Sequence, residues 1–238
     1  MNSHTAELAV ADISSRPVPG WFPTDNEMAD FIRGFSPVHR FVYPRYPIEL
    51  LRGFARLFPS GATEVLDVGA GNGVPGSTVQ RYFPDCTVRG VDVVARAHPE
   101  SLVRVSVYDG SNLPFPDRSF DISLLSNVIH HVPEEARAGL LAEVLRVTRR
   151  TILVKDHLAT GALSRRVLGL MDLIGNAPFG GMVRAEYLDA ESWKQLFSTV
   201  PVQVEAFGGL GVQRGPRAIV FRDRLEIAFR LAPEEAGV

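Results

Sequence analysis

The sequence has almost no cysteine and no long apolar run. Cys86 is the only cysteine among 238 residues, so no disulfide can form within the chain and no thiolate cage can hold a metal. A lone cysteine suits a reducing compartment. No apolar stretch reaches the length of a transmembrane helix, and the N-terminus lacks a basic segment followed by an apolar one. We therefore expect a cytoplasmic protein without a membrane span.

An excess of charge of either sign is also missing. The chain has 25 basic and 27 acidic residues, a net charge of −2, which argues against a partner bound by neutralising nucleic-acid phosphates. Its hydrophobic content of 45% and charged content of 22% are ordinary for a globular protein, and the length fits one large domain. We expect no nucleic-acid partner, and none of these features predicts an oligomeric state.

A glycine-rich segment follows the apolar pair Val65 and Leu66. Glycine occupies every second position of Gly69-Ala-Gly-Asn-Gly73. Alternating glycines allow positive φ and let a ligand lie against the main chain. If a helix begins near Val74, its unpaired N–H groups favour a carboxylate or phosphate there. The Asp67 carboxylate instead disfavours a diphosphate and favours an ammonium or sulfonium centre, so we predict a nucleotide-like cofactor with a cationic feature.

Strand-like and helix-like segments alternate after this loop, which predicts a Rossmann-like, doubly wound α/β sheet of seven mostly parallel strands. After the opening strand we expect strands at Cys86–Val91, Leu102–Tyr108, Ile122–Ser126, Thr151–Val154, Val202–Phe207 and Ala218–Phe221. We expect helices within Trp21–Phe35 and at Ile48–Phe58, Pro75–Phe83, Pro133–Val147, Leu163–Ile174, Ala190–Phe197 and Arg224–Arg230, with an irregular loop at Gly175–Gly181.

The predicted elements divide the chain into a cap and a main domain. Residues 1–60 are expected to form a loose tail up to about Val18, followed by a helical cap packed on the rest. Residues 61–238 are expected to form the main domain, with an insert around 158–190 that faces the substrate. The crossover Val93–Ser101 is unusually short for a connection between parallel strands.

Acidic residues follow two of the expected strands. Asp92 ends the second strand about 20 residues past the glycine loop, where a carboxylate suits the hydroxyls of a ribose. Asp109 follows the third strand. Either residue alone could be an ordinary turn former. Because ligands of open parallel sheets bind at the carboxyl ends of the strands, the combination favours a cofactor site.

Together these segments resemble the class I S-adenosylmethionine-dependent methyltransferases, particularly the UbiE-like small-molecule group. The resemblance extends from about Glu64 to His157 and includes the run Leu113-Pro-Phe-Pro-Asp-Arg-Ser-Phe-Asp121, which is similar to the family's entry to its fourth strand. It implies S-adenosylmethionine as cofactor. The cofactor-binding residues that it implies, together with Asn127 after the fourth strand, are Asp67, Gly69, Gly71, Gly73, Asp92, Val93, Asp109, Gly110, Leu113 and Asn127.

Polar residues after the fourth and fifth strands are candidates for the acceptor end of the site. Because histidine titrates near neutral pH and can accept a proton, we predict that His131 and His157 are catalytic. For His130 the alternative is a structural role at the start of the next helix. We predict that the acceptor is a small molecule methylated on O or N, possibly in specialised biosynthesis, and that no metal is bound. The predicted substrate-binding residues are His130, Asp156, Asn176 and Tyr187.

Two other functions are compatible with part of the pattern. Gly71-Asn-Gly-Val-Pro-Gly76 also spells the GxGxxG motif of nicotinamide-dependent oxidoreductases. However, Asp67 would then lie near a pyrophosphate, and the sequence offers no second mononucleotide site. The other alternative is a non-catalytic protein that retains the methyltransferase fold.

Overall fold

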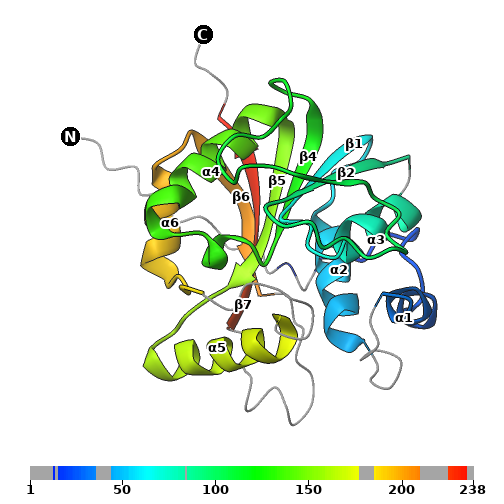
Figure 1. The fold of residues 1–238 in the computed structure, drawn as a ribbon, viewed down its shortest axis with the longest axis horizontal. Helices are drawn as coiled ribbons and strands as arrows, with labels where there is room; N and C mark the ends of the chain where they lie inside the picture. Colours follow the sequence, from blue (N-terminus) through cyan, green and yellow to red (C-terminus); the bar gives the residue numbers. More distant parts are fainter. Residues whose placement is uncertain are drawn as a thin grey trace.

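The computed structural model describes residues 13, 16–35, 44–83, 85–176, 185–209 and 225–234. Seven strands form one sheet, with helices packed on both of its faces (Figure 1). The elements in chain order are α1 (Asp25–Arg33), α2 (Arg45–Leu57), β1 (Glu64–Val68), α3 (Val74–Tyr82), β2 (Thr87–Asp92), β3 (Val105–Val107), β4 (Phe120–Ser126), the 3-10 turn η3 (Ile129–His131), α4 (Glu134–Val147), β5 (Thr148–His157), α5 (Ala162–Asn176), α6 (Ala190–Ser198), β6 (Val202–Gly208) and β7 (Glu226–Pro233).

The strand order in the sheet is β3-β2-β1-β4-β5-β7-β6. The first five strands in this order run parallel, and β7 is antiparallel to both of its neighbours. The predicted doubly wound, mostly parallel sheet is therefore confirmed. Its winding reverses between β1 and β4, and ligands of such sheets bind at that point beyond the carboxyl ends of the strands.

Successive side chains of the central strands point alternately into two hydrophobic cores, one on each face of the sheet. Val65 packs with α1, α2 and α3, whereas Leu66 packs with α4 and α6. Figure 1 shows these two helical layers on opposite sides of the sheet, with α5 lying beyond the end of β5. In the described part of the chain, no helix combines the length and the apolar character needed to cross a bilayer.

Local capping explains where several helices begin. Thr24 and Glu27 form a reciprocal capping box at the start of α1. Asp189 caps α6 by accepting the N–H of Ser192. Pro133 immediately precedes α4, whose first turn contains two glutamates that complement the helix dipole, as the sequence indicated.

The N-terminal part contributes to the core. Met28 and Ile32 of α1 are buried against the sheet, and the Tyr82 hydroxyl of α3 donates a hydrogen bond to the Glu27 carbonyl at 3.3 Å. Ile13 is fully buried in the same core, so the expectation of a loose tail is wrong at this residue. The rest of the expected tail up to residue 12 lies outside the described residues, as do residues 14–15.

The predicted C-terminal helix at Arg224–Arg230 is wrong, because this region contains strand β7. Ile227, Phe229 and Leu231 belong to the core on the α4 side of the sheet and Ala228 to the core on the other side, and the strand pairs with β5 and β6. Successive side chains thus enter opposite faces of the sheet, as in a strand buried on both sides. The expected strand Ala218–Phe221 lies outside the described residues.

Several element boundaries also differ from the expectation. Strand β3 is only three residues long, because Leu102 turns outward and its N–H donates to the Ser77 hydroxyl at 3.0 Å. Strand β5 extends to His157 because β7 pairs with it along that length. Helix α5 continues to Asn176, into the first residues of the expected loop at 175–181.

Candidate functional site

The three alternating glycines of the loop after β1 have left-handed backbones. Their φ angles are 69° at Gly69, 58° at Gly71 and 84° at Gly73. A Cβ at Gly69 would lie 2.6 Å from the Val128 side chain, and one at Gly73 would lie 2.4 Å from the Ser101 hydroxyl. Glycine is thus required here both by φ and by close packing against other loops. The loop leads directly into α3, whose first N–H groups face the end of the sheet.

Asp67 ends β1 with a carboxylate that is almost completely buried. Its Oδ2 accepts the Gly76 N–H at 2.9 Å, but its Oδ1 has no hydrogen-bond partner among the described residues. Burial raises the pKa of Asp67 to about 7; the Gly76 hydrogen bond acts against this rise, and the charge of Asp92 adds to it. A buried, unpartnered carboxylate oxygen beside the glycine loop suits a ligand cation such as an ammonium group.

Asp92 is held in place at the end of β2. Its Oδ2 accepts the Gly71 N–H at 2.7 Å, and its Oδ1 accepts the Val94 N–H at 3.0 Å. Each carboxylate oxygen has two lone pairs, so the side chain keeps capacity for a ribose hydroxyl. Arg96 also reaches Asp92, at 3.4 Å, and its guanidinium lies over Gly71. Sequence reasoning missed Arg96, although it lies in the crossover recognised as unusually short.

The residues after β3 follow the strand that pairs with Asp92, and their side chains mostly contact one another. Asp109 accepts the backbone N–H of Asn112 at 2.7 Å and its side-chain amide at 3.1 Å, which is the turn-forming role considered above. The Val93 side chain is 42% exposed and lies beside Gly110. Leu113 is buried in the core on the α4 side of the sheet.

A buried carboxylate–imidazole pair lies at the carboxyl ends of β4 and β5. Asp156 accepts the Ile129 N–H at 2.9 Å, and its other oxygen contacts Nδ1 of His130. Burial alone would lower the pKa of His130, but the charges of Asp156 and Asp172 outweigh burial and raise this pKa to about 9. In this arrangement the His130 ring carries a proton at neutral pH.

A second group of charges lies on the other side of the extended β5. Lys155 and His157 share one side of the strand, as predicted for a strand that reaches this far. Lys155 pairs with Glu226 of β7 and donates to the Asn127 side chain. His157 Nδ1 lies 3.2 Å from Glu226. Burial and Lys155 lower the pKa of His157, but Glu226 and Asp172 outweigh them, so the net shift is upward.

Asp172 of α5 connects the two histidines. Its Oδ2 lies 3.1 Å from His130 Nε2 and accepts the Tyr187 hydroxyl at 2.6 Å, and its Oδ1 lies 3.7 Å from His157 Nε2. Sequence reasoning missed Asp172, because one aspartate within a helix gives no signal. It missed Glu226 because that residue lay in a helix that does not exist.

The remaining predicted acceptor residues are at different distances from this cluster. The Tyr187 ring stacks on His130 at 5.4 Å between centroids, and the half-buried His131 ring lies 4.0 Å from the same imidazole. Asn176 ends α5, and its side chain lies outside what the structure describes. Of the predicted acceptor residues, the structure brings together His130, Asp156, His157 and Tyr187, with His131 alongside.

Arg137 of α4 fixes the turn that carries His130. Its Nε donates to the Val132 carbonyl at 2.9 Å, and its Nη2 donates to the Glu186 carbonyl at 3.1 Å. The Glu186 N–H in turn donates to the His130 carbonyl at 2.7 Å. Sequence reasoning interpreted this arginine only as part of a helix.

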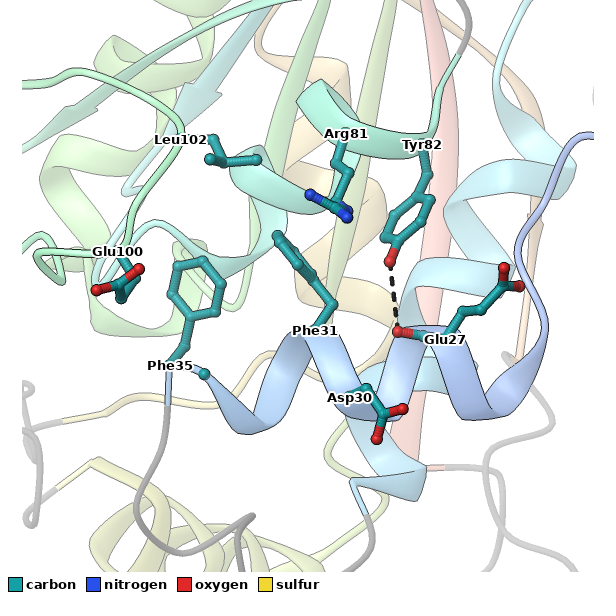
Figure 2. Close-up of a pocket in the computed structure, with 9 residues that line it drawn as sticks. Glu27, Asp30, Phe31, Phe35, Arg81, Tyr82, Glu100 and Leu102 are labelled. Atoms are coloured by element: carbon teal, nitrogen blue, oxygen red, sulfur yellow. Dashed lines mark hydrogen bonds between the residues drawn. The ribbon is translucent and has the colours of Figure 1, made fainter.

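A surface pocket of about 560 Å³ lies elsewhere, between α1 and the C-terminal end of α3. Figure 2 shows Phe31 and Arg81 facing each other across it, with Tyr82 and Glu27 joined by their hydrogen bond at one side. The pocket contains none of the predicted site residues. Its lining comes from α1, the end of α3 and the crossover, and not from the carboxyl ends of the central strands.

Comparison with known proteins gives one family match. The family model described as "Methyltransferase domain" matches residues 65–151, which span β1 to the start of β5. An uncharacterized methyltransferase of Mycobacterium sp. is 40% identical over 101 residues, covering 38% of this chain and 36% of that protein. A fatty-acid O-methyltransferase of Mycolicibacterium smegmatis is 32% identical over 112 residues, covering 44% of this chain and 40% of that protein. The chain thus spans less than half the length of these relatives.

The whole fold is similar to solved structures. The 1,6-didemethyltoxoflavin-N1-methyltransferase of Burkholderia thailandensis, solved with 1,6-didemethyltoxoflavin and S-adenosylhomocysteine bound, is 16% identical with a TM-score of 0.56. The similarity covers 92% of this chain and 94% of that one. At this identity the likeness establishes the fold alone.

Proposed function

We propose that this chain, whose residues 65–151 match a methyltransferase domain, is a class I S-adenosylmethionine-dependent methyltransferase that transfers a methyl group to an O or N atom of a small metabolite. The relatives that support it are the fatty-acid O-methyltransferase and the toxoflavin N1-methyltransferase, which act on an oxygen and a nitrogen. Assignment to the UbiE-like group stays a prediction.

The observation that carries this function is the pair formed by Asp67 and the glycine loop. Asp67 offers a buried carboxylate oxygen without a partner among the described residues, next to three left-handed glycines. S-adenosylmethionine has an ammonium group and supplies an activated methyl group on a positively charged sulfur. We place its methionine portion at this loop, with Asp67 facing the ammonium. A pyrophosphate would meet repulsion from the same carboxylate, which disfavours the nicotinamide alternative.

The neighbouring strand ends would hold the rest of the cofactor. Asp92 is oriented by two backbone N–H groups and keeps lone pairs for the ribose hydroxyls. Val93 and Gly110 lie side by side at the expected adenine position, with Asp109 at the turn. The remaining residues proposed for the cofactor are Gly69, Gly71, Gly73, Leu113 and Asn127.

The acceptor would lie over the ends of β4 and β5, in front of the methyl group. The proposed acceptor-binding residues are His130, Asp156, Asn176 and Tyr187. The segment around 158–190, which contains Tyr187, would contact the acceptor and determine which acceptor is bound. Because methyl transfer disperses charge, orienting the two reactants contributes much of the acceleration, about 7–11 kcal/mol in well-oriented systems. We propose that the domain covers residues 61–238 and works in the cytoplasm.

The raised pKa values of the buried histidines affect which residue can act as a general base. Burial and Lys155 lower the pKa of His157, but Glu226 and Asp172 outweigh them, so the net shift favours the protonated imidazole. Of the two proposed catalytic histidines, His157 lies inside this charged cluster, whereas His131 lies at its edge. An acceptor atom that does not have to lose a proton could be methylated without either histidine acting as a general base.

The test is methyl transfer from labelled S-adenosylmethionine to a panel of phenols, carboxylic acids, amines and ring nitrogens. The wild-type chain should label at least one O- or N-nucleophile, and His131→Ala and His157→Ala should lower the turnover number at saturating cofactor. His98→Ala, in the crossover, is the control variant. Labelling only of carbon acceptors would contradict the O/N assignment, and no labelling of any acceptor class would contradict the proposed activity.

A further inference from the structure

Two buried histidines direct the same ring nitrogen toward one carboxylate. Nε2 of His130 lies 3.1 Å from one oxygen of Asp172, and Nε2 of His157 lies 3.7 Å from the other. One ligand atom from each of the three residues can be chosen so that all lie within 4.8 Å of one another. The side chains come from η3, β5 and α5, so the tertiary fold brings them together.

The contact between His130 and Asp172 is close but is not a hydrogen bond. His130 is 1% exposed, and its Nε2 has no hydrogen-bond partner among the described residues, so the 3.1 Å approach has unfavourable angles. A buried ring nitrogen without a hydrogen bond costs free energy, and a ligand bound beside both atoms would offset this cost. Nε2 of His130 is therefore an atom at which a bound cation would find a buried donor beside the Asp172 carboxylate.

Each histidine is backed by a second carboxylate on its other nitrogen. Asp156 contacts Nδ1 of His130 and is itself fixed by the Ile129 N–H. Glu226 lies 3.2 Å from Nδ1 of His157, although outside hydrogen-bond geometry. Imidazoles that bind metals usually direct the second nitrogen to a carboxylate in this way, which fixes the tautomer that leaves Nε2 free.

The spacing and the charge both fit a divalent ion. With metal–ligand bonds of about 2.1 Å, the ligand atoms of a tetrahedral site are separated by roughly 3.4 Å, between the two distances above. Asp156, Asp172 and Glu226 carry three negative charges, and Lys155 supplies one positive charge. A metal ion that displaces the extra protons of the two imidazoles leaves a cluster charge of −2, which one divalent cation compensates.

We propose that His130, His157 and Asp172 bind a divalent transition-metal ion of the zinc or cobalt type, with Asp156 orienting His130. Two imidazoles and one carboxylate form a donor set typical of catalytic zinc sites, which keep one position open. Tyr187 donates to Asp172 at 2.6 Å and would hold this carboxylate in place. The sequence analysis predicted no metal, because it considered only thiolate ligands. The binding of the ion does not depend on the proposed methyl transfer.

The test is a titration of the metal-stripped full chain with Co²⁺, followed by the visible absorption of the bound ion. The wild-type chain should give a saturable cobalt spectrum that one equivalent of Zn²⁺ removes. Asp172→Asn and His157→Gln should weaken Co²⁺ binding by at least about 100-fold, and Asp156→Asn by about 10- to 100-fold. Circular dichroism of each variant shows that it is folded.

Matched substitutions outside the cluster serve as controls. Asp30→Asn on α1 and His98→Gln in the crossover remove the same side-chain types and should bind Co²⁺ like the wild type. The absence of a cobalt spectrum from the wild-type chain would overturn the proposal. So would a folded Asp172→Asn variant that binds as tightly as the wild type. Cobalt binding by a chain that methylates nothing would leave the metal site standing and contradict only the proposed activity.

Discussion

Asp67 is nearly balanced between its two protonation states at neutral pH. Burial is the main cause, because it raises the pKa of this carboxyl to about 7, and the hydrogen bond from Gly76 only partly counteracts it. A bound ammonium would favour the ionised form and pull the pKa down again. The ionised Asp67 carboxylate therefore destabilises the ligand-free protein at the pH values at which it would help to bind the cofactor. Such a compromise is common at functional sites.

Replacing Asp67 with asparagine should change how stability depends on pH. A carboxyl whose pKa is higher in the folded than in the unfolded chain contributes full stability only below about pH 4, and this contribution is lost as pH rises through 7. Asp67→Asn has no such loss. Relative to the wild type, its free energy of unfolding should improve by on the order of 3 kcal/mol between about pH 4.5 and about pH 8.

Urea unfolding of both proteins at the two pH values measures this difference. Parallel changes in the wild type and the variant would show that Asp67 is ionised throughout. Asp30→Asn is the control, because Asp30 is exposed on α1 and should leave the pH dependence unchanged.

At the level of single residues, sequence reasoning located the groups that follow strands and missed those that do not. Asp67 and Asp92 stand at strand ends, where parallel strands gather their termini. Asp172 approaches the histidines only through the packing of α5, and Arg137 acts on a turn formed from a different segment. Such contacts join positions far apart in sequence, so no local pattern reports them.

The glycine loop and α3 behave as one element. Gly73 has a φ of 84° and directly precedes α3, and a Cβ there would collide with the Ser101 hydroxyl of the crossover. Two constraints thus fix the conformation of the loop: its own left-handed backbone and the crossover segment that packs against it at Ser101.

Gly73→Ala should cost more stability than the same change at Gly61. Both glycines have positive φ, so each substitution should cost about 1–2 kcal/mol in backbone strain. Gly61 has open space around it, whereas Gly73→Ala must also displace Ser101, which adds about 1–3 kcal/mol. Thermal unfolding of the two variants measures the difference, and equal losses would refute the steric part of the argument.

Elements with a clear hydrophobic period were predictable, and short apolar ones were not. The strands and helices from β1 to α4 follow their patterns to within a few residues. Residues 224–230 are too few to distinguish a strand-like hydrophobic period of two from a helical period of 3.6. The segment forms a strand because it pairs with β5 and β6. Pairing with β7 also extends β5 beyond Val154, which carries Asp156 and His157 into the cluster.

On the scale of the whole molecule, two different chemical environments lie at one end of the sheet. The glycine loop and Asp92 lie at the ends of β1 and β2, and the buried histidine cluster lies at the ends of β4 and β5. The first was predictable from motifs, because it uses one contiguous stretch and one strand end. The second needs α5 and β7, so its full charge set appears only in the folded chain.

The most direct test of this account is calorimetric titration of the full chain with S-adenosylmethionine, in parallel with NADH. We predict saturable binding of S-adenosylmethionine, no comparable binding of NADH, and a loss of roughly 10-fold or more in affinity for Asp92→Ala, equivalent to about 1.4 kcal/mol. Asp30→Ala is the matched control, because Asp30 is exposed on α1, outside the proposed cofactor site, and its loss should leave the affinity unchanged. Tight binding of NADH without binding of S-adenosylmethionine, or an unchanged affinity in Asp92→Ala, would contradict the assignment of the cofactor site.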